Sequence, residues 1–237
     1  MKNLQISLRL KEIAGYISKG SFFADIGSDH AYLPSYLCLN DATANAIAGE
    51  VNEGPYNKAK EVVQTYNLES RIDVRLGDGL AVLKDDIPDT LVIAGMGGKL
   101  IESILTNDLN KTTKINKLIL QPNLDAQRLR EWFLKYNYNL IQEKIIEENN
   151  HFYEVLVAVQ SIDKDVYDET INLNKQTYFG PILINEHSYE FQKKWIEEKE
   201  NIIRIIKDMK RAKEINQLKL TEFENKLIWI EEVLNNE

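Results

Sequence analysis

The 237-residue chain has one cysteine, and this scarcity limits the structural sites that it can form. The single thiol, Cys38, excludes an intramolecular disulfide and argues against a structural zinc site, which normally takes several cysteines. No apolar run approaches the roughly 18 residues needed to cross a membrane, and no basic-then-apolar leader opens the chain. These absences favour a soluble, cytoplasmic protein with no membrane or metal partner, and we expect a monomer.

Positive charge is also in short supply. The chain has 29 Lys and Arg residues against 37 Asp and Glu residues, a formal net charge of −8, and its pI is near 5.1. This balance argues against nucleic-acid binding over the whole surface, but it leaves room for a local basic patch. At this length the chain can bury a core and hold one domain plus an appendage.

The most informative stretch is a strand-like apolar run that ends in a turn with a single glycine. Phe22–Gly27 is followed by a helix-compatible segment at residues 32–39, as in the first unit of a Rossmann-type fold. A dinucleotide-binding loop needs three glycines so that its backbone can approach a pyrophosphate. Here Gly27 stands alone, beside the acidic Asp25 and Asp29. The loop therefore favours S-adenosylmethionine, which has a sulfonium and an ammonium group but no pyrophosphate, over NAD.

Strand-like and helix-like segments alternate along residues 1–160, which predicts a domain with a mostly parallel sheet and helices on both faces. The predicted strands are Phe22–Gly27, Ala44–Glu50, Arg71–Leu76, Leu91–Ala94 and Lys117–Gln121. The predicted helices are Leu4–Lys19, Tyr32–Leu39, Glu53–Tyr66, Lys99–Leu105 and Asp125–Tyr136. Tyr138–Glu147 and Phe152–Gln160 are strand candidates with no helix between them, so we expect an antiparallel hairpin at the sheet edge.

Residues 161–237 form a different region, in which a polar linker through Pro181 precedes a helical segment. Apolar residues spaced for a narrow seam occur on two successive helices. They are Ile196, Ile203 and Ile206 on the first helix and Leu220, Phe223, Leu227, Ile230 and Leu234 on the second. Joined near residues 212–216, the two helices would pair as an antiparallel, coiled-coil-like arm. A surface for a protein partner is the alternative interpretation.

Acidic residues follow the predicted strands at the edge where such sheets bind ligands. Glu50 ends the second strand, where an acid can accept hydrogen bonds from ribose hydroxyls; a solvated strand-end carboxylate is the alternative. Asp78 lies between Gly77 and Gly79. These small neighbours would let an adenine ring lie against the backbone while Asp78 accepts from its amino group. Asp-Gly pairs are also common in plain turns.

Glycine is concentrated at the end of the fourth predicted strand. Three glycines in four positions, Gly95-Met96-Gly97-Gly98, would bring bare backbone close to another group. The fifth strand ends in Gln121-Pro122-Asn123, where enzymes that methylate exocyclic adenine nitrogens usually have an Asp/Asn-Pro-Pro-aromatic motif. Gln121 and Asn123 can offer amides to a base edge, and a helix cap is the alternative role for Asn123.

These motifs, taken in order, resemble one family. Asp25-Ile-Gly-Ser-Asp-His-Ala-Tyr-Leu-Pro34, Ala48-Gly-Glu-Val51, Gly77-Asp-Gly-Leu80, Ile93-Ala-Gly-Met-Gly-Gly98 and Leu118-Ile-Leu-Gln-Pro-Asn123 look like the motifs of bacterial tRNA (adenine-22-N1)-methyltransferases. The resemblance implies a Rossmann-like class I methyltransferase sheet, whose last strand inserts antiparallel, and a helical C-terminal arm. It also implies S-adenosylmethionine as the methyl donor and ring nitrogen 1 of adenine 22 in tRNA as the acceptor.

The resemblance and the strand-end pattern together give a set of candidate cofactor-binding residues. They are Asp25, Gly27, Ser28, His30, Glu50, Val51, Asp78, Gly79, Gly95, Met96 and Gly97.

The acceptor determines what the protein must supply. Ring nitrogen 1 of adenine has an in-plane lone pair, so no base is needed to create the nucleophile and catalysis should be mostly positioning. The methylated base is cationic, and Asp29 is the candidate catalytic residue, either for that charge or for a proton of the exocyclic amine. An N-cap or a cofactor contact is the alternative role of Asp29. Because the target nitrogen lies on the Watson–Crick edge, the nucleotide must be unpaired or flipped out, and Tyr32 and His30 can stack on it.

Binding of tRNA requires positive charge, which is locally in excess between residues 204 and 219. The basic residues of this stretch are Arg204, Lys207, Lys210, Arg211, Lys213 and Lys219. Arg9, Lys11 and Lys19 in the leading helix are further candidates to hold phosphates, and a solvated helix face is the alternative. The candidate substrate-binding residues are therefore Tyr32, Gln121, Asn123, Arg9, Lys207, Lys210 and Arg211.

Two further hypotheses remain at this point. The chain can be a methyltransferase for another RNA site or a small molecule, or a scaffold without catalysis whose arm binds a protein. The acids at Asp25, Glu50 and Asp78 argue against the scaffold, because it would not need them.

Overall fold

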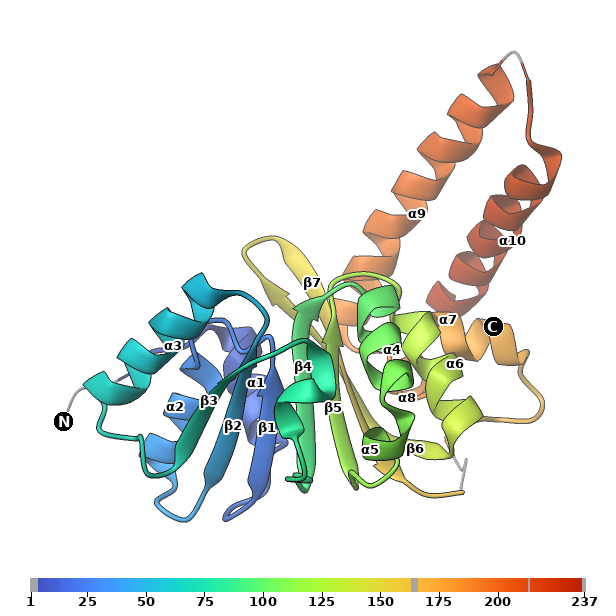
Figure 1. Ribbon diagram of the computed structural model, residues 1–237. Helices are drawn as coiled ribbons and strands as arrows, with labels where there is room; N and C mark the ends of the chain where they lie inside the picture. The colour runs from blue at the N-terminus through green and yellow to red at the C-terminus, as the bar shows by residue number, and fades with distance from the viewer. Residues whose placement is uncertain (1–3, 163–165, 213, 236–237) are drawn as a thin grey trace. The chain divides into compact units, whose positions relative to one another are not determined.

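The computed structural model describes residues 4–162, 166–212 and 214–235. The chain divides into two compact units, Met1–Tyr167 (unit 1) and Asp168–Glu237 (unit 2), whose elements are labelled in Figure 1. The sequence placed the boundary after residue 160.

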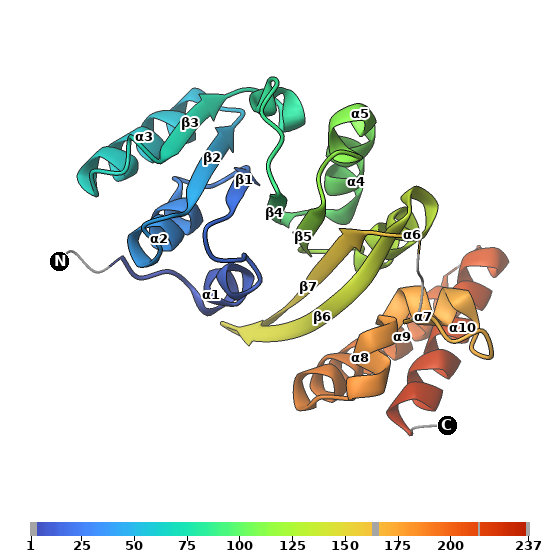
Figure 2. The ribbon, with the colours of Figure 1, turned by 90° about the horizontal axis from the view of Figure 1, so that it is seen from below.

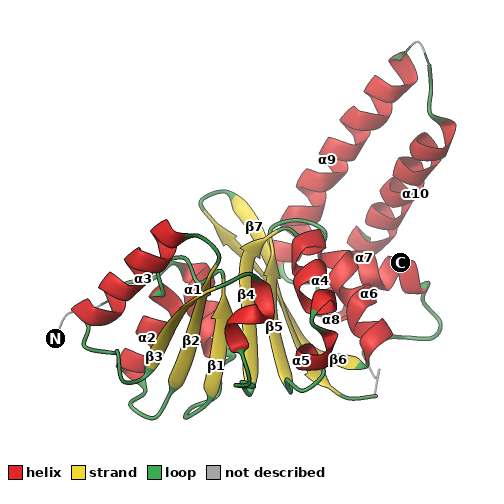
Figure 3. Cartoon of the chain, in the orientation of Figure 1, coloured by secondary structure: helices red, strands yellow, loops and turns green. Residues whose placement is uncertain are grey.

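Unit 1 contains a seven-stranded sheet in the order β3-β2-β1-β4-β5-β7-β6 (Figure 3). Its strands are β1 (Phe22–Ile26), β2 (Asn45–Glu50), β3 (Ile72–Leu76), β4 (Thr90–Met96), β5 (Lys117–Pro122), β6 (Tyr138–Glu148) and β7 (His151–Gln160). The first five strands pair in parallel, and β7 inserts antiparallel between β5 and β6. The predicted fold class and the inserted last strand are both confirmed.

Helices cover both faces of this sheet, as Figure 2 shows. They are α1 (Leu8–Gly15), α2 (Tyr32–Asn40), α3 (Glu53–Thr65), the 3-10 helix η1 (Gly79–Leu83), α4 (Gly98–Asn107), α5 (Leu109–Thr112) and α6 (Ala126–Tyr136). Ile13 of α1, Leu33 of α2 and Val63 of α3 share one buried cluster with the sheet. The central strands are apolar along their length because both of their faces are covered.

Several element boundaries differ from the sequence prediction by one or more residues, and three of them have a visible local feature. Helix α1 begins at Leu8 rather than Leu4, because Ser7 caps it by accepting a hydrogen bond from Leu10 N at 3.2 Å. Strand β4 continues beyond Ala94 to Met96 through an irregularity in its pairing with β5. Helix α6 begins at Ala126 because Asp125 takes a left-handed conformation, with φ 61°.

A buried ion-pair cluster joins α6 to the β6–β7 hairpin. The guanidinium of Arg130 lies 2.6 Å from Glu143 Oε1 and also pairs with Glu154. Burial alone would lower the pKa of Arg130, but the two carboxylates outweigh it and raise that pKa. Such a cluster holds its elements in one register, because removing one partner would leave a buried charge uncompensated.

Unit 2 is helical throughout its regular structure. Its helices are α7 (Leu173–Phe179), α8 (Pro181–Glu186), α9 (Tyr189–Arg211) and α10 (Gln217–Leu234). The prediction of a linker through Pro181 was wrong in part, because α7, capped by Asn172, occupies its second half. An aromatic cluster forms the base of the unit, with 4.4 Å between the ring centroids of Phe179 and Trp195. No helix in the described part of the chain has the length and apolarity to cross a membrane.

Helices α9 and α10 run antiparallel as the predicted hairpin (Figure 1). The seam on α9 differs from the prediction. Trp195, Ile202 and Ile206 are buried, whereas Ile196 is 49% exposed and Ile203 is 43% exposed. The helix carries two apolar stripes one residue apart, and periodicity alone cannot choose between them. Aromatic packing around Trp195 decides which stripe faces inward.

The seam on α10 follows the prediction more closely. Leu220 and Ile230 are buried, and Phe223, Leu227 and Leu234 are half-buried. Ion pairs between the two helices flank this seam, with Lys199 Nζ 2.8 Å from Glu231 Oε1 and Lys210 Nζ 2.7 Å from Glu224 Oε1.

Candidate active site

The loop after β1 directs its backbone N–H groups at the end of β2. The N–H groups of Gly27 and Ser28 donate to the Gly49 carbonyl at 2.9 and 3.2 Å. Those of Asp29 and His30 lie near the Glu50 carboxyl group and oppose the rise that burial causes in its pKa. In a dinucleotide-binding loop such groups would point at a pyrophosphate. Here they are used within the protein, which gives the physical reason why a loop with one glycine suffices.

The same loop then passes through a run of left-handed residues. Asp29, His30 and Ala31 have φ values of 44°, 70° and 56°, a conformation that non-glycine residues adopt at a cost. The Asp29 side chain is 87% exposed, with Oδ1 3.5 Å from His30 Nε2. The N-cap of α2 is Ala31, without a side-chain capping bond, so the alternative role of Asp29 as an N-cap was wrong.

The backbone conformation of Gly27 is the reason that glycine occupies this position. Its φ of 69° is left-handed, and a Cβ atom there would overlap Met96 Cε. The Met96 side chain therefore lies across the turn of the β1 loop. Two predicted cofactor residues from distant strands thus meet at the carboxyl edge of the sheet.

Two buried carboxyl groups lie beneath this loop. Burial raises the pKa of Asp25 to about 7, against a hydrogen bond from Ser28 Oγ at 2.6 Å and the nearby charge of Arg9. Burial also raises the pKa of Glu50, which is 6% exposed. Glu50 Oε1 is buried and has no hydrogen-bond partner among the described residues. Such an acceptor is costly unless a ligand donor satisfies it, and ribose hydroxyls are suitable donors.

Asp78 is exposed at the end of β3, in the turn before η1. Its side chain makes no capping hydrogen bond to η1, so its carboxylate is not used as a helix cap. Gly79 follows it with φ 51°. Leu76 and Val51 are exposed apolar residues that adjoin the Asp78 turn and Glu50 in sequence.

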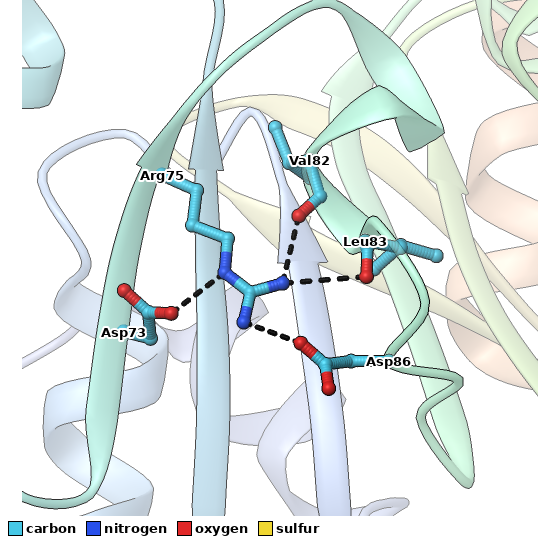
Figure 4. A network of polar contacts seen from close by, with 5 residues as sticks. All are labelled: Asp73, Arg75, Val82, Leu83 and Asp86. Atoms are coloured by element: carbon cyan, nitrogen blue, oxygen red, sulfur yellow. Dashed lines mark hydrogen bonds and ion pairs between the residues drawn. The ribbon is translucent and has the colours of Figure 1, made fainter.

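Arg75 of β3 stabilises the Asp78 turn through contacts with residues on both sides of it in sequence (Figure 4). Arg75 Nη1 donates to the Val82 carbonyl at 2.9 Å, at the end of η1. Its other nitrogens pair with Asp73 at 2.7 Å and Asp86 at 2.6 Å. The planar guanidinium group of Arg75 thus links β3, which precedes the turn, to η1, which follows it.

A bulge at the end of β4 is braced by a buried glutamine of β5. Gly95 has φ 77°, and its N–H donates to Gln121 Oε1 at 3.1 Å. Arg9 Nη1 donates to the same oxygen. Gln121 Nε2 donates to the Pro122 carbonyl at 2.9 Å and to Asn123 Oδ1 at 3.3 Å. The amide of Gln121 is thus fully used within the protein, so the expectation that it faces a base edge is corrected.

Asn123 and Arg9 complete this brace. Asn123 Nδ2 donates to the Gly95 carbonyl at 2.8 Å, and the N-cap position of α6 belongs to Asp125, which makes no side-chain capping bond, so the helix-cap alternative for Asn123 was wrong. Arg9 is half-buried, with its guanidinium 5.2 Å from the centroid of the Tyr153 ring. It therefore lies in the site rather than on an outer phosphate-binding face.

The remaining glycines of the β4 motif have different roles. A Cβ atom at Gly98 would overlap the carbonyl oxygen of Asp125, so this glycine permits close packing of α4 against the loop after β5. A Cβ atom at Gly97 would meet no atom within 4 Å. Gly97 is exposed at the N-cap of α4.

The two predicted stacking residues lie beside Asp29. The rings of His30 and Tyr32 pack edge to face, with 5.7 Å between their centroids. Tyr32 is half-buried at the start of α2. An aromatic surface and an exposed carboxylate thus occur together on the β1 loop.

The predicted basic residues of unit 2 lie mostly on the exposed part of α9. Lys207 and Arg211 are exposed, and Lys210 is exposed but paired with Glu224. Lys213 lies outside the described residues. Lys11 and Lys19 of unit 1 are also exposed.

Comparison with known proteins connects this geometry to a family. The model of the family described as tRNA (adenine(22)-N(1))-methyltransferase matches residues 23–232. The Bacillus subtilis protein of that name is 43% identical over 238 aligned residues, which cover 100% of each chain. The chain belongs to the tRNA (adenine(22)-N(1))-methyltransferase family.

Solved structures of this methyltransferase family agree in fold over the whole chain. The B. subtilis M1A22 tRNA methyltransferase is 44% identical, with a TM-score of 0.90, and the match covers 98% of this chain and 99% of that one. Streptococcus pneumoniae Sp1610, solved in complex with S-adenosyl-L-methionine, is 37% identical, with a TM-score of 0.86 and coverage of 97% and 100%. The predicted family and enzyme class are confirmed, and so is S-adenosylmethionine as the cofactor with which the family works.

Proposed function

We propose that this chain transfers a methyl group from S-adenosylmethionine to ring nitrogen 1 of adenine 22 in tRNA. Membership of the methyltransferase family supports the reaction, and one observation in the site carries the assignment. The exposed carboxylate of Asp29 lies on a loop whose backbone donates hydrogen bonds to the Gly49 carbonyl, next to Glu50, a buried acid with an unsatisfied oxygen. This arrangement provides a cofactor contact and a substrate contact on adjacent elements.

The cofactor residues follow from the chemistry of their side chains. S-adenosylmethionine, when bound, supplies an electrophilic methyl group on a sulfonium. Glu50 accepts hydrogen bonds from its ribose hydroxyls, and Asp78 accepts from its adenine amino group. Asp29 adds negative potential around the β1 loop, which favours a cationic ligand, and a bound cation in turn favours the ionised form of Asp25. Gly27, Ser28, His30, Val51, Gly79, Gly95, Met96 and Gly97 form the rest of the proposed cofactor surface.

The acceptor base requires orientation more than activation. Its ring nitrogen has a lone pair in the plane of the ring, so the protein must hold that nitrogen in line with the methyl group. Tyr32 and His30 offer faces on which an unpaired adenine can stack. Asp29 stabilises the positive charge that develops on the base. Asn123 donates a hydrogen bond to the Gly95 carbonyl and so helps to hold the backbone at the end of β4 in place.

The assembly and location of the enzyme complete the proposal. All the proposed site residues come from one chain, which supports a monomer with an arm that pairs as a short coiled coil. A tRNA substrate supports action in the cytoplasm.

The function is tested by mapping methylation on a defined tRNA transcript. With S-adenosylmethionine, we expect one methyl group at ring nitrogen 1 of adenine 22. A transcript with guanine at position 22 should accept none. Methylation that persists in the guanine transcript, or that maps only to another nucleotide or another atom, would refute the proposed acceptor.

Changing both Lys207 and Arg211 to Glu should weaken tRNA binding by about tenfold or more. The slope of the logarithm of the binding constant against the logarithm of the salt concentration should also become shallower, by about two. Each basic contact with a phosphate releases counterions, so losing two contacts reduces the slope. Lys210 is left unchanged because it pairs with Glu224, and its reversal would disturb the helical hairpin itself. Filter binding across a salt series measures both quantities.

The matched control for these changes is the reversal of Lys114 and Lys135 to Glu. Both lysines are exposed on unit 1, near the ends of elements away from the carboxyl edge of the sheet, and the net charge changes by the same amount. The proposal would be excluded if the α9 variant kept the tRNA affinity and salt slope of the wild-type protein. It would also be excluded if both variants lost the same amount of tRNA affinity, because α9 would then not be a specific tRNA-binding surface.

A further inference from the structure

We propose that Tyr153 of β7 binds the target adenine, as the wall of the acceptor site on the side of the β6–β7 hairpin, and that Arg9 of α1 positions its ring. The inference rests on the proposed function and deepens it, because it assigns a further binding residue for the base that accepts the methyl group. None of the site residues predicted from the sequence lies on this hairpin.

Tyr153 lies at the edge of the sheet where the candidate site is found. Strand β7 runs antiparallel to β5, and the last pair of the two strands towards this edge is Leu120 with Leu156. Asn123 lies three residues further along the chain from Leu120, and Tyr153 lies three residues before Leu156. The two residues therefore reach the carboxyl edge of the sheet together.

The ring of Tyr153 lies on the face of the sheet that α1 covers. Side chains alternate along a strand, so Tyr153 shares its face with Val155 and Val157. Those two valines belong to the buried cluster that contains Ile13 and Ala14 of α1. Helix α1 thus approaches the site over the same face from which Tyr153 projects.

Arg9 holds the Tyr153 ring from the start of α1. Its guanidinium carbon lies 5.2 Å from the centroid of the ring, and its Nη1 donates to Gln121 Oε1. Leu8 N donates to Glu148 Oε1 at 2.6 Å, which links the start of α1 to the end of β6, and Figure 2 shows these two elements side by side. Tyr153 itself is half-buried. The ring is therefore fixed in place while part of it stays open to a ligand.

The chemistry of the acceptor provides a use for this ring. The lone pair of ring nitrogen 1 lies in the plane of the base, so the methyl group arrives at the edge of the base and leaves both of its faces for stacking. His30 and Tyr32 of the β1 loop and the start of α2 offer one aromatic surface. Tyr153 offers another, beyond the ends of β4 and β5 in the order of the strands.

The role of Tyr153 is tested with two tRNA transcripts, one with adenine and one with an abasic site at position 22. Binding is measured with S-adenosylhomocysteine in the cofactor site, so that no methyl group is transferred. Tyr153→Ala should weaken binding of the adenine transcript by about fivefold to 100-fold and change binding of the abasic transcript by no more than about twofold. Tyr153→Phe keeps the ring and should bind both transcripts as the wild-type protein does.

Tyr136→Ala is the matched control. Tyr136 is also a half-buried tyrosine beneath a cation, with Lys135 Nζ 5.0 Å from its ring centroid. It ends α6 just before β6 begins, at the opposite edge of the sheet, so its loss should leave both affinities unchanged. Should Tyr153→Ala fail to fold, Tyr153→Leu keeps an apolar side chain without a ring, and the same comparison applies.

Arg9→Lys tests the positioning role of Arg9. Lysine keeps the charge but lacks the planar group that contacts both Gln121 and the ring. The preference for adenine over the abasic transcript should fall by about threefold or more in the wild-type background and stay unchanged in a Tyr153→Leu background. Lys11→Arg, an exchange of cations at an exposed position of the same helix, should not change this preference. A loss of the same size in both backgrounds would show that Arg9 does not act through Tyr153.

The outcomes separate this inference from the proposed function. If Tyr153→Ala weakens binding of both transcripts equally, Tyr153 supports the fold rather than the base, and the inference is overturned. Unchanged binding of both transcripts by the variant would overturn it as well, and so would a wild-type protein that binds the two transcripts equally. The proposed function depends instead on methylation of adenine 22 by the wild-type enzyme, and it stands or fails whatever Tyr153 contacts.

Discussion

Replacing Asp29 with alanine should lower the single-turnover rate of methyl transfer by about 10²–10³-fold, while cofactor affinity changes by no more than about twofold. The methylated adenine is cationic, and removing a preorganised group that stabilises developing charge commonly costs this much. The Asp29 side chain is 87% exposed, so it becomes desolvated only when the base covers it. An effect confined to the chemical step is therefore expected. Rapid-quench single turnovers at saturating cofactor give the rate, and calorimetry gives the affinity.

Two companion variants sharpen this result. Asp29→Asn keeps the shape and the backbone but removes the charge, so it should be nearly as slow as Asp29→Ala if charge is what matters. Asp85→Ala, at an exposed acid in the loop before β4, should behave as wild type. If Asp29→Ala loses rate and cofactor affinity by the same factor, Asp29 is a binding residue and its proposed catalytic role is wrong.

The sheet was predictable from the sequence because its strands are short apolar runs that end in glycine or acidic residues. Buried strands such as β1 and β5 have few interpretations other than a parallel sheet covered on both faces. The hairpin of β6 and β7 was visible as two strand patterns with no helix between them. Its insertion beside β5 was implied only by the family resemblance, because pairing order depends on contacts between distant segments.

The α9 seam shows where periodicity stops being sufficient. Ile203 and Ile202 are neighbours, and either can belong to an apolar stripe at helical spacing. The structure buries Ile202 because Trp195 packs among aromatic rings that other helices supply. Nothing local to α9 contains that information.

The candidate site also contains some features that were predictable from the sequence and others that were not. The acids at strand ends were predictable because the carboxyl edge of a parallel sheet gathers them. The bonding of Gln121 to Arg9 was not, because the two residues lie on elements far apart in sequence and the contact depends on side-chain placement. Glu50 illustrates both cases. Its place at a strand end suggested a ribose contact, whereas the approach of the Asp29 loop to its carboxyl group depends on three consecutive left-handed residues.

The stability of the protein should fall as the pH rises from about 4 to 7, and Asp25→Asn should remove about 4 kcal/mol of that fall. Burial raises the pKa of Asp25 from 3.8 to about 7, so between these values the folded protein holds a proton that the unfolded chain releases. A proton bound more tightly by the folded state stabilises it at low pH, and this stabilisation is lost as the pH rises through the folded pKa. Above about pH 7 the contribution of Asp25 should no longer change.

Denaturant unfolding at a series of pH values, without cofactor, measures this effect for both proteins. The quantity compared is the change in unfolding free energy between pH 4 and pH 8, so any constant effect of the new amide on folding cancels. Glu50 also has a raised pKa and contributes a slope of the same sign, which both proteins share. As a control, Asp85→Asn should leave the pH dependence of wild type unchanged, because this acid is exposed. If Asp25→Asn loses as much stability between pH 4 and pH 8 as the wild-type protein does, Asp25 is ionised throughout that range, and its burial does not govern its charge.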